Sequence, residues 1–482
     1  MSYQINRSII WLFILFLFLS VLCISTVAKE ISITTKSDKA KELFIKGRSL
    51  ADNLQSVEAA HVFDEAIKAD PNFALAHVFR ALTGIGGFNV VHEHLNTAMK
   101  LADKVTEGEK NLIYFASAMI DGNQMKEKMY LDNLLNSFPD NKRVQLWAGV
   151  YHYNLNDFST AKNYISKAVQ LDSKFAPAYN MLGYTDSKLN DYKGAETAFK
   201  TYISLVPDNP NPYDSYAELL LNMGKYDDAI KQYQMALSKD SKFTSSLDGI
   251  GHCYVFKGNY DEARKNYQKC FDISNDINSK LNALAWIATS YVHQGNTSKA
   301  ISTIEQERML AQKNHLTSNE INSLNTEAFI LTEAGKPDEG IKKLDMASDL
   351  IKKAMLPADV TERLTLLTDL NRNRALISAG KLDEAQKSLT SLKDRITKRN
   401  NTFEIEALNG DMALLDIKKG NYREAIDHFN KSDLTSDVNQ YYMGVAYEKM
   451  GNKMKADECF QKVKNSRSNN LGLAVVRSRA TE

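Results

Sequence analysis

The stretch Gly258-Asn259-Tyr260-Asp261-Glu262-Ala263 is one copy of a phrase that this chain repeats. Related phrases begin at Gly224, Gly295, Gly335, Gly380, Gly420 and Gly451. Each phrase has apolar residues at helical spacing on both sides, and glycine is the residue that most easily ends a helix in a left-handed conformation. Acidic residues just after the glycine suit the positive end of the helix that follows. The phrase therefore predicts the tight turn of a helical hairpin, repeated along the chain.

Around these turns runs a second pattern with a period of about 34 residues. Small residues recur at positions 8, 20 and 27 of each repeat, a bulky apolar residue at 24, and proline at 32. The repeat at residues 40–73 fills these five positions with Gly47, Ala59, Phe63, Ala66 and Pro71. Later repeats keep most of the pattern, as in Gly251, Ala263, Tyr267 and Cys270. Small residues let two helices approach closely, and proline ends the second helix because it cannot continue the hydrogen bonding.

This spacing resembles the tetratricopeptide repeat, a helix–turn–helix unit of 34 residues. The resemblance implies an all-α fold, a right-handed superhelical solenoid in which the first helix of each repeat, helix A, lines the concave wall. We expect 11–12 repeats, a count of the kind such arrays show. The expected layout is a leader at 1–28, a connector at 29–38, an N-terminal array at 39–277 with repeats near 40, 74, 108, 142, 176, 210 and 244, a C-terminal array at 278–465 with repeats near 281, 321, 366, 406 and 437, and a cap or loose tail at 466–482. The repeats near 74 and 108 match poorly, and those beyond 277 drift in spacing.

The first 28 residues contain an uncharged run from Ile9 to Ala28. A cleaved signal peptide would end at the small residues Thr26-Val27-Ala28, whereas an uncleaved membrane anchor would use the whole run of residues 9–28. A lipid-modified Cys23 is a weaker alternative, because Leu22 stands where a small residue is normal. Each alternative predicts an exported protein, periplasmic or extracellular, or one anchored to a membrane. The leader and the array together resemble exported bacterial repeat proteins of unknown function.

Charge and motifs argue against several classes of function. The chain has 60 Lys and Arg against 59 Asp and Glu, a balance without the basic excess typical of nucleic-acid binding. The three cysteines beyond the leader have neither disulfide-framework nor metal-ligand spacing. His92-Glu93-His94 begins like a zinc-protease helix, but Asn96 stands where the second ligand is needed. The sequence therefore predicts a non-catalytic protein with no metal and no cofactor.

Residues for partner binding come from the resemblance alone. In tetratricopeptide repeats, positions 2, 5, 9, 12 and 13 tend to face the groove. In the central repeats these offsets give Tyr153, Asn180, Tyr184, Lys188, Asp214, Glu218, Asn222, Asp248, His252, Phe256 and His293. Asp214 and Asp248 stand where the lysine of a carboxylate clamp would be expected, so a basic or neutral peptide fits better than a free carboxylate. The alternative is that these are ordinary solvated helix positions.

Three functions remain open from the sequence. The first is an exported interaction scaffold that binds a protein or peptide on its concave face. The second is a membrane-tethered assembly factor held by residues 9–28. The third, an enzyme with a site inside the array, has no motif in its favour. The identity of the partner and the oligomeric state stay open.

Overall fold

The computed structural model describes residues 29–399 and 401–480, and these residues are helical with no strand among them. The twenty-four helices α2 to α25 form twelve successive pairs, followed by the short helix α26. This confirms the predicted all-α fold of stacked helical hairpins. The chain divides into two compact units, Met1–Pro207 and Asp208–Glu482, which are described separately. The predicted leader at 1–28 lies outside the described residues.

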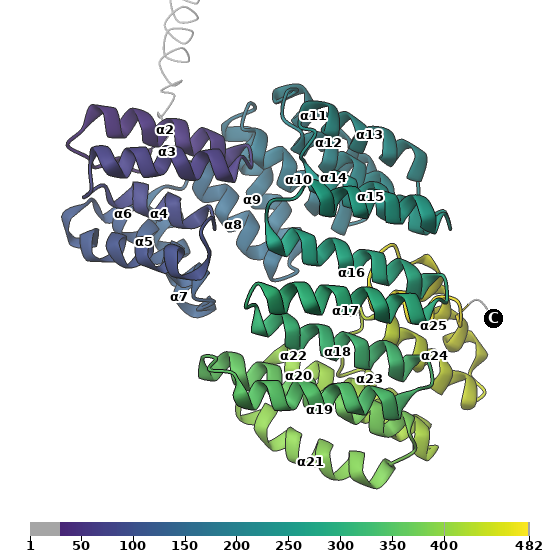
Figure 1. The fold of residues 1–482 in the computed structure, drawn as a ribbon. Helices are drawn as coiled ribbons and strands as arrows, with labels where there is room; N and C mark the ends of the chain where they lie inside the picture. The colour runs from purple at the N-terminus through teal and green to yellow at the C-terminus, as the bar shows by residue number, and fades with distance from the viewer. Residues whose placement is uncertain (1–28, 400, 481–482) are drawn as a thin grey trace, which may run out of the picture. The chain divides into compact units, whose positions relative to one another are not determined.

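Residues 29–207 of unit 1 form five helix pairs (Figure 1). They are α2 (Asp38–Asp52), α3 (Ser56–Ala69), α4 (Ala74–Leu82), α5 (Gly87–Leu101), α6 (Glu107–Ile120), α7 (Gln124–Ser137), α8 (Lys142–Asn154), α9 (Phe158–Leu171), α10 (Ala176–Lys188) and α11 (Tyr192–Leu205), with a 3-10 turn at Ala102–Lys104. In the poorly matching region, α4 has only 9 residues, and Gly84, Gly86 and Gly87 in the connection to α5 all have positive φ angles. A shortened helix A and a glycine-rich turn explain why the period is weak there.

Unit 2 contains seven pairs and α26. They are α12 (Asn211–Asn222), α13 (Tyr226–Lys239), α14 (Thr244–Phe256), α15 (Tyr260–Ile273), α16 (Ile277–His293), α17 (Thr297–Lys313), α18 (Thr317–Glu333), α19 (Pro337–Lys353), α20 (Ala358–Ser378), α21 (Leu382–Arg399), α22 (Thr402–Lys419), α23 (Tyr422–Phe429), α24 (Asp437–Lys449), α25 (Lys453–Asn465) and α26 (Leu471–Val476). Helices α16 to α22 have 17 to 21 residues, against 12 to 14 in α12 to α15. One extra helical turn is 3.6 residues. Longer helices, rather than longer loops, therefore account for the drift in spacing.

The small residue at position 8 is explained by the ring at position 24 of the same repeat. A Cβ atom on Gly251 would lie 2.2 Å from Cε1 of Tyr267, and one on Gly183 would lie 2.6 Å from Cε1 of Phe199. Both rings are 0 % exposed. Carbon atoms pack at about 3.5–4.0 Å, so a side chain at position 8 has no room. The helices of a pair are close because the ring of one rests on the bare backbone of the other.

The turns of the repeated phrase are left-handed, as the sequence predicts. Gly258 has a φ of +75°, and the other phrase glycines lie between +74° and +83°. After Gly258, the side chain of Asn259 accepts a hydrogen bond from the backbone N–H of Glu262 and caps α15. Three repeats of unit 1 lack the glycine, and Leu54, Asn156 and Asn190 take the left-handed conformation there. Asparagine tolerates that region better than most residues do.

Candidate functional site

The A helices of unit 2 carry the candidate site. Successive A helices α12, α14 and α16 are in contact, and so are α18 and α20. We call the surface of α14, α16 and α18 that meets residues 466–480 the A-helix face. After α25 ends, residues 466–480 turn back, and α26 within them packs against α16 and α24. This stretch, the 466–480 segment, lies on the A-helix face.

Asn469 is the polar centre of this contact, and it is 8 % exposed. Its side-chain Nδ2 donates to the Oη of Tyr267 at 3.2 Å and lies 2.9 Å from Nδ1 of His252. Its Oδ1 accepts from Nε2 of His293 at 3.2 Å. Nδ1 of His252 is also 2.8 Å from the Tyr267 hydroxyl, and the edge of Trp286 meets the His252 ring at 4.7 Å between centroids. One amide thus engages three polar side chains from α14, α15 and α16.

Both histidines are held neutral at this place. Burial lowers the pKa of His252 to about 4. Burial, with the nearby Arg477 guanidinium, also lowers the pKa of His293 to about 4. Neutral imidazole offers one donor and one acceptor nitrogen. The pair can therefore receive an amide, which presents both a donor and an acceptor.

Beyond Asn469 the segment becomes apolar. Leu473 and Val476 are both 0 % exposed and belong to a cluster with Val438 and Val463. Partly buried side chains of the A helices pack against that cluster, among them Phe256, Val292 and Phe329. Burying an aliphatic side chain stabilises by about 1.5–3 kcal/mol. The apolar stretch therefore supplies most of the hydrophobic contact with the face.

An arginine follows the apolar stretch. Nη1 of Arg479 donates to Oε2 of Glu333 at 2.9 Å, and Nη2 donates to the backbone carbonyl of Glu333 at 2.6 Å. The Glu333 side chain is 5 % exposed, and Tyr442 also donates to its Oε2, at 3.3 Å. Two cavities, of about 190 and 160 Å³, are each lined in part by Glu333 and Arg479. The segment therefore leaves part of the surface around the ion pair unfilled.

Buried carboxyl groups line the same array of A helices on α12 and α14. Burial raises the pKa of Asp214 to about 7, and the nearby Glu218 and Asp248 add to this effect. The hydroxyl of Ser246 donates to Oδ1 of Asp214 at 2.6 Å. Burial likewise raises the pKa of Asp248 to about 6. These groups carry partial charge near neutral pH, so the charge of this region depends on pH.

The eleven residues predicted to bind a partner fall into two sets. Tyr153, Asn180, Tyr184 and Lys188 lie on α8 and α10 of unit 1, where the Tyr184 ring meets Phe199 edge-on at 5.2 Å. Asp214, Glu218, Asn222, Asp248, His252, Phe256 and His293 lie on α12, α14 and α16 of unit 2. The structure brings His252, Phe256 and His293 together around the 466–480 segment, with Arg477 over the Phe256 ring at 5.0 Å. Their contact with a partner stays a prediction.

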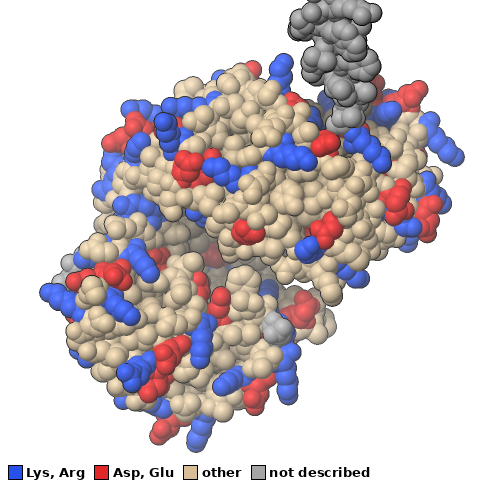
Figure 2. Space-filling view, turned by 180° about the vertical axis from the view of Figure 1, so that it is seen from behind, with Lys and Arg blue, Asp and Glu red and all other residues tan. Residues whose placement is uncertain are grey.

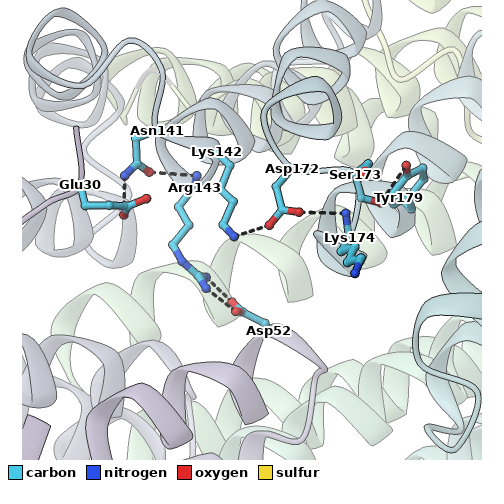
Figure 3. Close-up of polar contacts among 9 residues, drawn as sticks. All are labelled: Glu30, Asp52, Asn141, Lys142, Arg143, Asp172, Ser173, Lys174 and Tyr179. Carbon is cyan, nitrogen blue, oxygen red and sulfur yellow. Dashed lines mark hydrogen bonds and ion pairs between the residues drawn. The ribbon is translucent and has the colours of Figure 1, made fainter. Parts of the chain in front are cut away.

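A polar cluster in unit 1 joins helices far apart in the sequence (Figure 3). Arg143, at the start of α8, donates two hydrogen bonds of 2.5 and 2.6 Å to Asp52, at the end of α2. Beside it, Asn141 caps α8 and donates to Glu30 at 2.9 Å, and Lys142 pairs with Asp172 at 2.5 Å. These contacts hold α8, which carries Tyr153, against the first repeat.

Groups for chemistry are sparse in the part of the chain that the structure describes. No cluster of three or more His, Cys, Asp or Glu side chains there is placed to hold a metal ion. Cys253, Cys270 and Cys459 are buried, and burial raises the pKa of the Cys253 thiol to about 12 and of Cys270 to about 11. Thiols in that state are poor nucleophiles near pH 7. None of the helices in residues 29–399 and 401–480 combines the length and apolar character needed to cross a membrane.

Charges of both signs alternate over the face drawn in Figure 2. Lys and Arg side chains lie next to Asp and Glu side chains on that face. Within unit 2, Arg372 pairs with Asp345 and Lys381 with Asp338. Neither sign dominates that face. Such a balance of charge produces no strong long-range field of one sign.

Sequence reasoning missed the contribution of the 466–480 segment. Asn469, Arg477 and Arg479 contact the A-helix face, but this stretch has no turn phrase and no repeat register. The run Leu471–Val476, which is apolar apart from one glycine, was the available signal that it packs against something. Its position on helices about 200 residues earlier could not be inferred from local pattern.

Comparison with known proteins gives repeat-level similarity. The tetratricopeptide repeat family matches residues 176–209, 245–277 and 439–470. The chain is 30 % identical over 102 residues to the BBSome complex member BBS4 of Bos taurus, covering 21 % of this chain and 20 % of that protein. It is 28 % identical over 221 residues to the mitochondrial import receptor subunit TOM70 of Saccharomyces cerevisiae, covering 44 % and 33 %. The match thus spans a third or less of either relative.

Two solved structures are also similar. A tetratricopeptide repeat protein from Parabacteroides merdae aligns with 54 % of this chain and 98 % of its own, at 14 % identity and a TM-score of 0.38. YrrB, described as a TPR protein with an unusual peptide-binding site, aligns with 46 % of this chain and 98 % of its own, at 20 % identity and a TM-score of 0.26.

Proposed function

We propose that this chain, which contains tetratricopeptide repeats, is a non-catalytic scaffold that binds a partner protein through a peptide on the A-helix face of unit 2. One observation carries the proposal. A polypeptide stretch, the 466–480 segment, already lies on this face with its amide, apolar and charged groups each matched. Peptide grooves combine apolar area with a few orienting polar groups in this way. Relatives such as the import receptor subunit TOM70 are consistent with a protein-binding role.

The test is partner capture with matched variants. Phe256→Ala removes an aromatic ring from the A-helix face, whereas Met235→Ala changes a residue of α13 that is 43 % exposed. We expect the chain and its Met235→Ala variant to recover the same partner, and Phe256→Ala to recover at least tenfold less. Equal recovery by Phe256→Ala, with an unchanged circular dichroism spectrum, would remove this face as the binding surface.

Export is the second part of the proposal and rests on the leader sequence. We propose that residues 1–28 direct the chain out of the cytoplasm and are removed after Ala28. The alternative is a membrane-tethered assembly factor, in which residues 9–28 remain as an anchor. N-terminal sequencing of the protein from its native cells decides between them. A chain that begins at Lys29 supports cleavage, and one that keeps Ile9 supports the anchor.

A further inference from the structure

The 466–480 segment contacts more helices than it would need to cover the last repeat of the array. A cap would cover only the last repeat, α24 and α25. This segment instead contacts His252 on α14, 217 positions before Asn469, and Glu333 on α18, 146 positions before Arg479. Its chemistry therefore matches the A-helix face, in addition to covering the end of the array.

The match follows an order along the segment. An amide at Asn469 fits the neutral His252 and His293, the apolar residues of α26 fit the cluster that Phe256 joins, and the guanidinium of Arg479 fits Glu333. A ligand that covered the face without an amide or a guanidinium at these places would leave the contacts to His293 and Glu333 unmade. Leaving a buried polar group unpaired costs about 1–3 kcal/mol, so the order discriminates among ligands.

The last position is selective for arginine over lysine. Two different nitrogens of Arg479 donate to two oxygens of Glu333, one on the side chain and one on the backbone. A planar guanidinium presents two donors at a fixed spacing, whereas an ammonium is a single point charge. The two adjoining cavities show that the surface there extends beyond what the segment covers. A longer or bulkier peptide has room to bind around the same ion pair.

We propose that the A-helix face recognises a peptide with a side-chain amide, then a short apolar stretch, then an arginine, and that the 466–480 segment is its built-in competitor. This rests on the proposed function and specifies its ligand. A partner peptide binds by displacing the segment from the face. The partner's affinity is then reduced by the fraction of time that the segment occupies the face.

The experiment uses the full chain and a labelled synthetic peptide with the sequence of residues 466–482. Arg479→Glu places a second carboxylate against Glu333 and should release the segment, and Asn469→Ala is a milder release by loss of the amide contacts. Arg399→Glu, which breaks an ion pair with Glu404 on the surface, is the matched control. Hydrogen exchange of amides 471–480 reports release, and fluorescence anisotropy reports peptide binding.

We expect both releasing variants to exchange these amides at least tenfold faster than the parent chain and the Arg399→Glu control. We also expect them to bind the peptide at least tenfold more tightly than the parent. Peptides with Asn469→Ala or Arg479→Lys should bind at least fivefold more weakly. Combining Glu333→Arg with Arg479→Glu should slow the exchange again, which also shows that the charge changes permit folding.

Two results overturn the proposal. If exchange accelerates without any gain in peptide binding, the segment is a structural brace and the face has no peptide site of this chemistry. If neither variant changes exchange, the segment does not leave the face. The peptide assay needs no natural partner. Its failure is thus separate from failure of the capture experiment with Phe256→Ala.

Discussion

Gly251→Ala tests the link between repeat packing and the binding face. The new Cβ would lie 2.2 Å from Cε1 and 2.6 Å from Cζ of the buried Tyr267 ring. Contact distances of about 3.5–4.0 Å require the ring to move by more than about 1 Å. The hydroxyl of that ring lies within hydrogen-bond distance of His252 and Asn469, so the movement disturbs the site as well as the core.

The magnitude follows from opposing effects. Alanine is favoured over glycine inside a helix by about 1 kcal/mol. Overpacking costs about 1–3 kcal/mol, and weakening one or two hydrogen bonds costs about 1 kcal/mol each. The expected net loss in free energy of unfolding is about 2 kcal/mol. With a urea dependence of about 2–3 kcal/mol per molar, the midpoint should fall by about 0.7–1 M.

Urea unfolding followed by Trp286 fluorescence measures this loss, because the indole lies next to His252. The chain should start at Lys29 and carry Trp147→Phe, so that the signal comes from unit 2 alone. Gly410→Ala is the control, since its Cβ would meet only the Asn439 amide at 3.2 Å. An unchanged or higher midpoint for Gly251→Ala would refute the reasoning. Additive effects in a double variant with Tyr267→Leu would also refute it, because removal of the ring should relieve the clash.

Three further outcomes are expected. Asp214→Asn should stabilise unit 2 by about 2–4 kcal/mol at pH 8 and by little at pH 4. The pKa of the Asp214 carboxyl is about 7 in the folded state and about 4 in the unfolded chain, so its ionisation destabilises the fold increasingly as the pH rises from 4 to 7. Urea melts at both pH values measure this, and an equal effect of the substitution at the two would contradict it. Arg143→Ala should lower the stability of unit 1 by about 1–3 kcal/mol, because it removes two hydrogen bonds to Asp52. In a double-mutant cycle followed by thermal unfolding, the double variant with Asp52→Ala should lose less stability than the two single variants added together. Strict additivity would argue against an interaction between Arg143 and Asp52. Gly258→Ala should lower the free energy of unfolding by about 1–2 kcal/mol in the same urea assay, because the φ of Gly258 is +75° and a side chain is unfavourable there. An unchanged free energy of unfolding would mean that the turn can adopt another conformation.

The sequence was sufficient for features that depend on local contacts. Gly258 marks a turn because the backbone there is left-handed. Gly251 and Tyr267, at positions 8 and 24 of one repeat, go together because the buried ring leaves no room for a side chain at position 8. Both signals lie within one repeat. Where the helices lengthen, as in the 21 residues of α20, the left-handed glycine at 380 still marks the turn, but no residue pattern fixes how many helical residues precede it. The spacing between successive repeats beyond residue 277 could therefore be predicted only as a range.

The candidate site was only partly accessible from sequence. Family offsets placed His252, Phe256 and His293 on helix A, and the structure groups them. Burial in the folded chain keeps His252 and His293 neutral, and the neighbours of these histidines in the sequence do not reveal it. Asn469 resembles a turn residue in sequence, and only the folding-back of the chain makes it the centre of the contact.

The position of this segment also has a consequence for the order of events during synthesis. A ribosome completes α14, α16 and α18 well before residues 466–480 emerge, since these helices end at residues 256, 293 and 333. At roughly 5–20 residues per second, the stretch between the end of α18 and residue 466 takes about 7–27 seconds to synthesise. During that interval the nascent A-helix face has no segment of its own to cover it. A partner that meets the chain before residues 466–480 fold back finds an uncovered surface, whereas one that arrives later must first displace the 466–480 segment.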